Sequence, residues 1–97
     1  MYKLLLFLNK TNEEQVVNHF NDYTVRYLSE ITGRQIEVAN VESNLLLEQK
    51  FSKFCEAYVD SKEVWDKLMQ SKPGRELNLD LMEFHIFITV IFVDYKN

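Results

Sequence analysis

The chain has 97 residues, of which 46% are hydrophobic and 13% aromatic, and its net charge is −4 at pH 7. This length predicts one domain, residues 1–97, and more apolar material than so small a domain easily hides, which favours self-association. Basic residues are scattered and outnumbered by acidic ones, so a nucleic-acid partner is not expected. The single cysteine, Cys55, forms no internal disulfide framework and is typical of a reducing cytosol, so a cytoplasmic location is expected.

The first predicted element is a strand over residues 2–9 that lacks a polar face. Alternate side chains of a strand point to opposite sides, and here Leu4 and Leu6 would point one way while Leu5 and Phe7 point the other. A strand with one wet face should instead alternate apolar with polar residues. The apolar run is also far shorter than the roughly 18 residues of a membrane span, so no membrane partner is expected.

A helix is predicted next, beginning at a capping box formed by Thr11 and Glu14. Apolar residues recur at three- and four-residue spacing along one face, and Gly33 suits a left-handed C-cap. The expected inward face consists of Val16, Val17, Phe20, Thr24, Tyr27, Leu28 and Ile31. His19 on this helix is expected to be an ordinary half-exposed histidine.

Two more strands are predicted in the middle of the chain. Residues 34–42 alternate well enough for an outer strand, and residues 51–59 form a second strand. In the second strand Phe54, Glu56 and Tyr58 lie opposite Cys55, Ala57 and Val59. The segment 43–50, with three consecutive leucines, is either a short edge strand or a dimer contact.

The last third of the chain predicts a broken helix and a final strand. Ser61, or Asp60 with Glu63, can cap a helix whose apolar stripe includes Trp65. Pro73 and Gly74 interrupt the helix, and one or two further helical turns follow. Residues 85–95 then form a strand that is apolar on both sides.

The order β-α-β-β-α-β predicts an α+β, ferredoxin-like fold, with a four-stranded antiparallel sheet and two helices on one face. Two short helical segments can cover only one face of such a sheet. Because the first and last strands are apolar on both sides, the other face is expected to pack on a second copy. A homodimer that forms an α/β barrel is therefore predicted.

Several local patterns resemble dimeric α/β-barrel proteins, and among them the EthD-like family. They are the opening strand 2–8, the segment Glu14–Phe20 with its His-aromatic pair, the segment Tyr58–Ser61 followed by Trp65, and the break at 69–75. The resemblance implies a homodimer with an apolar small-molecule pocket between sheet and helices. It also implies cofactor-free chemistry on an aromatic or polyketide-like ligand, of an oxidoreductase, monooxygenase or isomerase type.

The chain departs from the family at one position of the first helix. EthD-like proteins usually carry a second histidine there, followed by a small residue and proline, whereas this chain reads Tyr23-Thr24-Val25-Arg26. The pocket-facing position becomes Thr24, which cannot do histidine chemistry. Haem-degrading monooxygenases share the fold, and Asn9 and Trp65 match their pattern, but no histidine stands near residue 75.

The candidate site therefore combines residues from four predicted elements. His85, at the start of the last strand, is the expected proton-transfer group, since imidazole ordinarily exchanges protons near neutral pH. Its expected partner is a carboxylate such as Glu56 or Asp60. The expected ligand-binding residues are Thr24, Tyr27, Tyr58, Trp65 and Glu56. The alternative is that the aromatic residues are core and that Glu56 faces outward, paired with a lysine or arginine.

No metal site or cofactor is expected, because two histidines and one cysteine without ligand-type spacing form no recognisable set of ligands. Three functions stay open from the sequence. One is an enzyme acting on a small aromatic molecule, the second is a non-catalytic binding protein, and the third is an assembly module.

Overall fold

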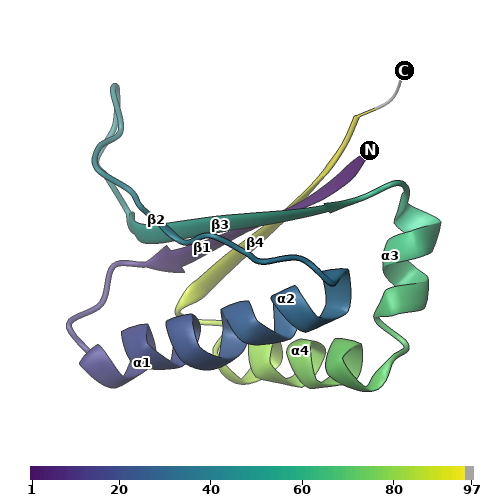
Figure 1. Ribbon diagram of the computed structural model, residues 1–97. Coiled ribbons are helices and arrows are strands. Elements are labelled where there is room, and N and C mark those ends of the chain that lie inside the picture. The colour runs from purple at the N-terminus through teal and green to yellow at the C-terminus, as the bar shows by residue number, and fades with distance from the viewer. Residues whose placement is uncertain (96–97) are drawn as a thin grey trace.

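A computed structural model describes residues 1–95 as a four-stranded antiparallel sheet with helices on one face (Figure 1). The strands, in the order β2-β3-β1-β4 across the sheet, are β1 (Tyr2–Asn9), β2 (Ala39–Asn40), β3 (Phe51–Val59) and β4 (Ile88–Asp94). The helices are α1 (Glu14–His19), the π-helical η1 (Phe20–Thr24), α2 (Val25–Thr32), α3 (Lys62–Leu68) and α4 (Lys72–Glu83). The predicted ferredoxin-like α+β fold is confirmed.

The core lies between the central strands and the helices. β1 pairs with β3 on one side and β4 on the other, so that Leu6 stands opposite both Cys55 and Val90. The alternate leucines of β1 point toward the helices and are almost completely buried. The core consists of Leu4, Leu6, Leu8, Val16, Phe20, Val25, Leu28, Ile31, Cys55, Ala57, Trp65, Leu77 and Ile88.

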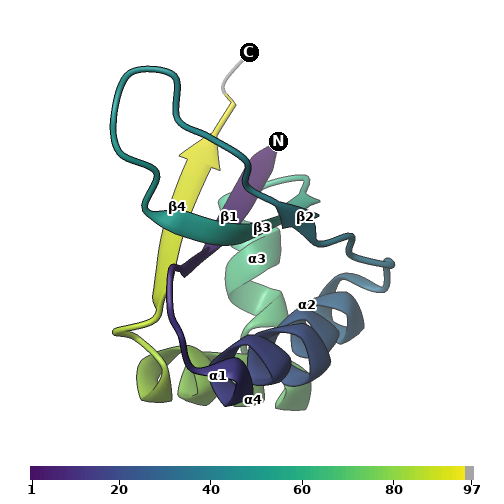
Figure 2. The same cartoon turned by 90° about the vertical axis from the view of Figure 1, so that its left-hand side faces the viewer.

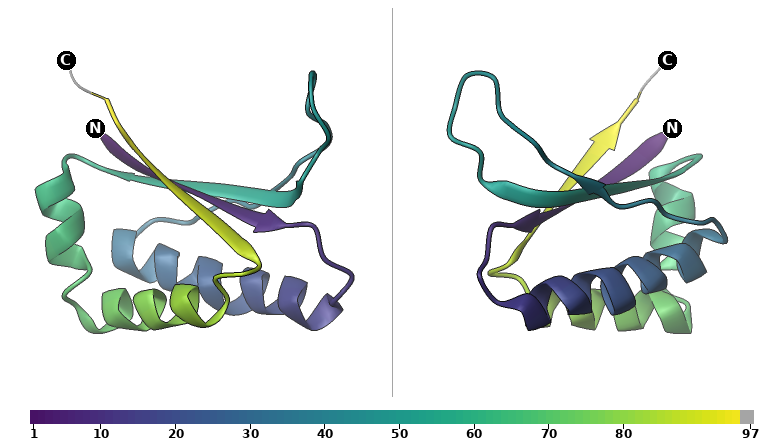
Figure 3. Two further views of the ribbon diagram at one scale, coloured as in Figure 1. Left: turned by 180° about the vertical axis from the view of Figure 1, so that it is seen from behind. Right: turned by 60° about the vertical axis from the view of Figure 1, so that its left-hand side comes forward.

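The helical layer has two parts that run below the sheet and a third at its end. α1, η1 and α2 form one continuous helical segment that lies beside α4, while α3 stands across the end of the sheet (Figures 1 and 3). The hydroxyl of Ser61 caps α3 by accepting from Val64 N, and Ser71 caps α4 by accepting from Gly74 N. The predicted helix break is confirmed, but it lies at residues 69–71, and Pro73 and Gly74 stand in the first turn of α4.

The other face of the sheet carries no helix and is largely apolar. Phe7 packs against Phe51 and Phe54, with ring centroids 4.5 Å and 5.0 Å apart. Following the strand registers, this helix-free face consists of Lys3, Leu5, Phe7, Phe51, Phe54, Glu56, Tyr58, Thr89, Ile91 and Val93. β1 and β4 thus carry mainly apolar side chains on both of their faces, as the sequence predicts.

The predicted outer strand over residues 34–42 is wrong in length, because only Ala39 and Asn40 pair with β3. Residues 43–50 form no strand. We name residues 41–50 the leucine loop; in it Leu45, Leu46 and Leu47 are 95%, 85% and 73% exposed. The leucine loop rises from the sheet on the side away from the helices (Figures 1 and 2). Within residues 1–95, no helix has the length and apolarity that a membrane crossing requires.

Candidate functional site

A cavity of about 660 Å³ lies between the helix-covered side of β1 and β4 and the helices α3 and α4. It has the size of an ordinary small-molecule pocket. It is lined by Leu4, Trp65, Met69, Arg75, Asn78, Leu79, Leu81, Val90 and Phe92. The break between α3 and α4 creates this space, because α3 stands across the end of the sheet while α4 runs beneath it (Figure 3).

Aromatic rings form one wall of this cavity. Trp65, the only tryptophan of the chain, is 6% exposed and meets Phe92 edge to face at 5.9 Å between ring centroids. Phe92 in turn stacks on Tyr2 at 5.5 Å. Leu4 and Val90 complete the surface on the sheet side. Such a wall favours a planar, apolar ligand.

The polar groups of the cavity come from one helix. Arg75 and Asn78 lie on α4, and both are exposed at the cavity. A guanidinium nitrogen of Arg75 donates to the carbonyl of Gln70 at 2.9 Å. The other N–H groups of the guanidinium can still donate to a ligand. Among the described residues that line the cavity, Arg75 carries the only charge and none is a histidine or carboxylate.

The structure does not bring all the predicted site residues together. Trp65 lines the cavity, whereas Tyr58 and Glu56 lie on the helix-free face. The reason is strand alternation: Cys55 and Ala57 of β3 point to the helices, so their neighbours must point away. There Glu56 lies 3.8 Å from Lys3, and Arg34 stacks over Tyr58 at 4.1 Å.

The predicted proton-transfer group, His85, lies apart from the cavity. It is exposed, and its Nδ1 donates to the carbonyl of Met82 at 3.0 Å. Neither Glu56 nor Asp60 is its hydrogen-bond partner. Tyr27 is half-buried against the core, with Arg26 over its ring at 5.6 Å. Ligand binding by these residues stays a prediction.

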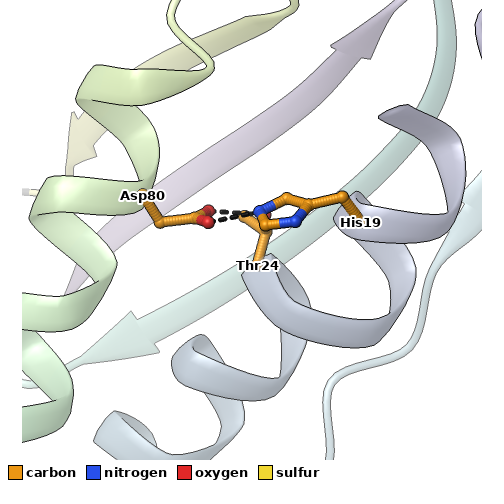
Figure 4. A network of polar contacts seen from close by, with 3 residues as sticks. All are labelled: His19, Thr24 and Asp80. Carbon is orange, nitrogen blue, oxygen red and sulfur yellow. Dashed lines mark hydrogen bonds and ion pairs between the residues drawn. The ribbon is translucent and has the colours of Figure 1, made fainter. Parts of the chain in front are cut away.

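Thr24 takes part in a polar network that the sequence analysis missed. Its hydroxyl donates to Oδ2 of Asp80 at 2.6 Å, while Nε2 of His19 bonds to Oδ1 of the same carboxylate (Figure 4). Thr24 is fully buried and Asp80 is 7% exposed. The ring of His19 stacks with those of Phe84, at 4.0 Å, and Tyr23, at 5.1 Å. The network therefore joins the first helical segment to α4.

The π-helical turn η1 explains how His19 and Thr24 reach one carboxylate. In an α-helix, residues five apart point about 140° away from each other around the axis. The wider π turn, with its i→i+5 hydrogen bonds, brings such residues closer to the same side of the helix. Residues 20–24 form this turn, so that His19 immediately precedes it and Thr24 is its last residue. Single π turns inside α-helices are frequent at functional sites.

The remaining reactive side chain, Cys55, is held inert. Burial, with a smaller contribution from the charge of Glu56, raises the pKa of the Cys55 thiol from 9.0 to about 12. A thiol of this kind is a poor nucleophile at neutral pH. No group of three metal-ligating side chains occurs within residues 1–95.

Comparison with known proteins supports the fold. No protein-family model matches the chain, and no curated protein matches it. A solved structure of an ethyl tert-butyl ether d (EthD) family protein from Bacillus halodurans is similar, with 23% identity and a TM-score of 0.79 over 99% of each chain.

An Arabidopsis thaliana protein, described as hypothetical, is similar in two solved structures. Its crystal structure shares 16% identity with a TM-score of 0.61 over 99% of this chain and 93% of that one. Its solution structure shares 14% identity with a TM-score of 0.55 over 99% and 87%. The chain therefore has the same ferredoxin-like fold as a protein of the EthD family from Bacillus halodurans.

Proposed function

We propose that the protein is a homodimeric α/β-barrel protein that binds a small, mostly apolar aromatic molecule in the cavity between α3, α4 and the sheet. The observation that carries this proposal is the cavity itself, about 660 Å³ in volume, with Trp65 and Phe92 on one wall and Arg75 at its edge. An aromatic acid matches this arrangement, because its ring is apolar and its carboxylate suits a guanidinium.

The lining favours binding over proton transfer at this site. A general base or acid must lie within hydrogen-bond reach of the ligand, and the described residues around the cavity supply neither an imidazole nor a carboxylate. Of the functions that the sequence leaves open, a non-catalytic binding protein is thus the one supported best here.

The helix-free face supports the dimer. The protein exposes 6784 Å² of surface, whereas a folded monomer of this mass is expected to expose about 5,800 Å². The difference, roughly 1,000 Å², is similar to the ~800 Å² that each partner buries in a standard interface. Part of the excess comes from the exposed leucines of the leucine loop. This loop rises on the side of the sheet where the second copy would sit (Figure 1).

Fluorescence of Trp65 tests the binding proposal directly, since this single tryptophan lines the cavity. Titration with 2-naphthoic acid and with hydroxynaphthoquinones should change the emission in a saturable way. Leu79→Phe should weaken the change by narrowing the cavity that Leu79 lines, and the fold should tolerate it because Leu79 is 66% exposed. Absence of any saturable change across a panel of aromatic acids and quinones would refute the proposal.

Arg75→Gln tests the chemistry of the ligand. This variant should weaken binding of the acid by about ten- to a hundredfold, since a hydrogen bond to a charged group contributes roughly 1.5–3 kcal/mol. The uncharged analogue 2-acetylnaphthalene should bind the wild type and the variant equally. An acid that binds both proteins with the same affinity would show that Arg75 does not contact the ligand.

A further inference from the structure

A second cleft, of about 370 Å³, lies between α1 and the turn that joins α4 to β4. It is lined by Glu13, Gln15, Val16, His19, Phe84 and Phe87. None of these residues lines the cavity of the proposed function. None belongs to the helix-free face either, so a dimer formed through that face leaves the cleft open.

The hydrogen bond to Asp80 determines which nitrogen of His19 is free. A carboxylate only accepts hydrogen bonds, so Nε2 of His19 must carry the proton in this pair. In the neutral ring, Nδ1 then has a lone pair and accepts. Among residues 1–95, the side-chain hydrogen bond of His19 is formed by Nε2 with Asp80, and none is formed by Nδ1. Figure 4 shows Nε2 facing Asp80. His19 lines the cleft, and its side chain is 25% exposed.

Asp80 prepares this ring to receive a proton. Its carboxylate is nearly buried and is held on its other oxygen by the Thr24 hydroxyl. A proton that arrives at Nδ1 creates an imidazolium beside this fixed negative charge, which stabilises it. A carboxylate that orients and supports an imidazole in this way is a recurrent arrangement in proton transfer.

We infer that this cleft binds a small phenol and takes the proton of its hydroxyl group onto Nδ1 of His19. The phenol O–H bond breaks, the Nδ1–H bond forms, and the phenolate remains beside the imidazolium of His19, whose other nitrogen still donates to Asp80. Phe84, Phe87 and Val16 supply the apolar surface for the ring.

Titration of the protein with 4-nitrophenol tests the inference, because the phenolate and the phenol absorb at different wavelengths. Below the pH at which free 4-nitrophenol ionises, wild-type protein should increase the phenolate absorbance in a saturable way. In NMR spectra, the same titration should shift the resonances of His19, Phe84 and Phe87. Leu79→Phe, which changes only the other cavity, should leave both responses intact.

Two controls separate proton acceptance from apolar contact and from folding. The methyl ether 4-nitroanisole has no hydroxyl proton and should bind the wild type about tenfold more weakly. His19→Gln should abolish the rise in phenolate absorbance, and circular dichroism should show that it is folded. If His19→Gln does not fold, the affinities of wild-type protein for 4-nitrophenol and 4-nitroanisole are sufficient to test the inference. Equal binding of phenol and ether, or unmoved His19 resonances, would overturn the inference.

Discussion

Asp80 is a carboxylate held inside the protein by the ring of His19 and the hydroxyl of Thr24. Burying a carboxylate is costly unless its oxygens accept hydrogen bonds. The structure meets this demand with two side chains that lie 61 and 56 residues away in the chain. At the scale of single residues, this carboxylate is therefore the point where the two helical segments depend on each other.

Thr24→Val should destabilise the protein by about 1–3 kcal/mol. Valine has nearly the shape of threonine but removes the donor to Oδ2 of Asp80, so a buried acceptor is left unsatisfied. Thr24→Ser is the matched control, because it keeps the hydroxyl and loses only a methyl group. Urea unfolding measures both; a smaller loss for valine than for serine would contradict the role given to the hydroxyl.

Cys55 should react with thiol reagents only when the protein opens. Since burial raises its pKa from 9.0 to about 12, the thiolate fraction near pH 8 is roughly a thousandfold lower than for an ordinary cysteine. Labelling with 5,5′-dithiobis(2-nitrobenzoic acid) should therefore be slow in buffer and fast in urea. Rapid labelling of the folded protein would contradict the buried position.

The same pKa shift predicts a loss of stability in alkali. The folded pKa lies above the unfolded one, so the contribution to stability is complete below pH 9 and is lost as the pH rises toward 12. Cys55→Ala should remove this part of the pH dependence. Urea unfolding of both proteins between pH 8 and pH 11 measures the difference.

At the scale of secondary structure, the corner between α3 and α4 depends on Gly74. A Cβ atom there would lie 2.5 Å from Met69 Cα and would also meet the carbonyl oxygen of Leu68, and both are backbone atoms. Gly74→Ala should therefore cost about 1–3 kcal/mol. The substitution should also disturb the cavity, because Met69 and Arg75 flank this corner and line the cavity. Thermal unfolding and Trp65 emission report the two effects.

Gly33→Ala serves as the comparison, since it tests conformation without crowding. Gly33 ends α2 at φ 67°, and no atom lies within 4 Å of the point that a Cβ atom would occupy there. Its substitution should cost about 1–2 kcal/mol through the left-handed backbone alone, and Trp65 emission should not change. If both glycine variants leave the emission unchanged, the corner does not shape the cavity.

The central strands of the sheet are predictable from the sequence, whereas its edge is not. β1 and β3 match their predicted bounds, because long apolar or alternating runs specify buried strands. β2 is much shorter than predicted, since an alternating pattern at the edge of a sheet does not tell how many residues find a partner. The break between α3 and α4 is visible in the sequence because Pro73 and Gly74, which begin α4, act on the local backbone.

The candidate site is only partly visible in the sequence. Trp65 is identifiable, but Asp80 is not, because a single acidic residue in a helical stretch looks like part of a solvated face. His19 looks ordinary for the same reason. Their pairing depends on a contact between distant segments and on the π turn η1. The position of Thr24 on the inward face is the one available indication of a polar group there.

At the scale of the whole molecule, β4 offers a test of the dimer through two adjacent residues. Ile91 faces the helix-free side and is 43% exposed, whereas Val90 faces the core. Ile91→Asp should give a folded monomer, because an unpaired carboxylate inside an interface costs several kcal/mol. Val90→Asp should unfold the protein. Light scattering and circular dichroism distinguish the two outcomes.

Ile91→Thr is the matched control for the dimer test, since it adds polarity without charge. It should remain dimeric with a weaker association. Wild-type protein that is monomeric at micromolar concentration, or an Ile91→Asp variant that stays a stable dimer, would show that the helix-free face is not the interface.

The position of β1 in the sheet also has a consequence for how the chain folds during synthesis. β1 is made first, yet it pairs with β3 and β4, and β4 is completed only at Asp94. The apolar segment of β1 therefore lacks its paired strands until β3 and then β4 have emerged from the ribosome. Contacts between such distant residues slow folding and lengthen the time in which aggregation competes. The strand most central to the finished sheet is thus the one most in need of protection before the sheet exists.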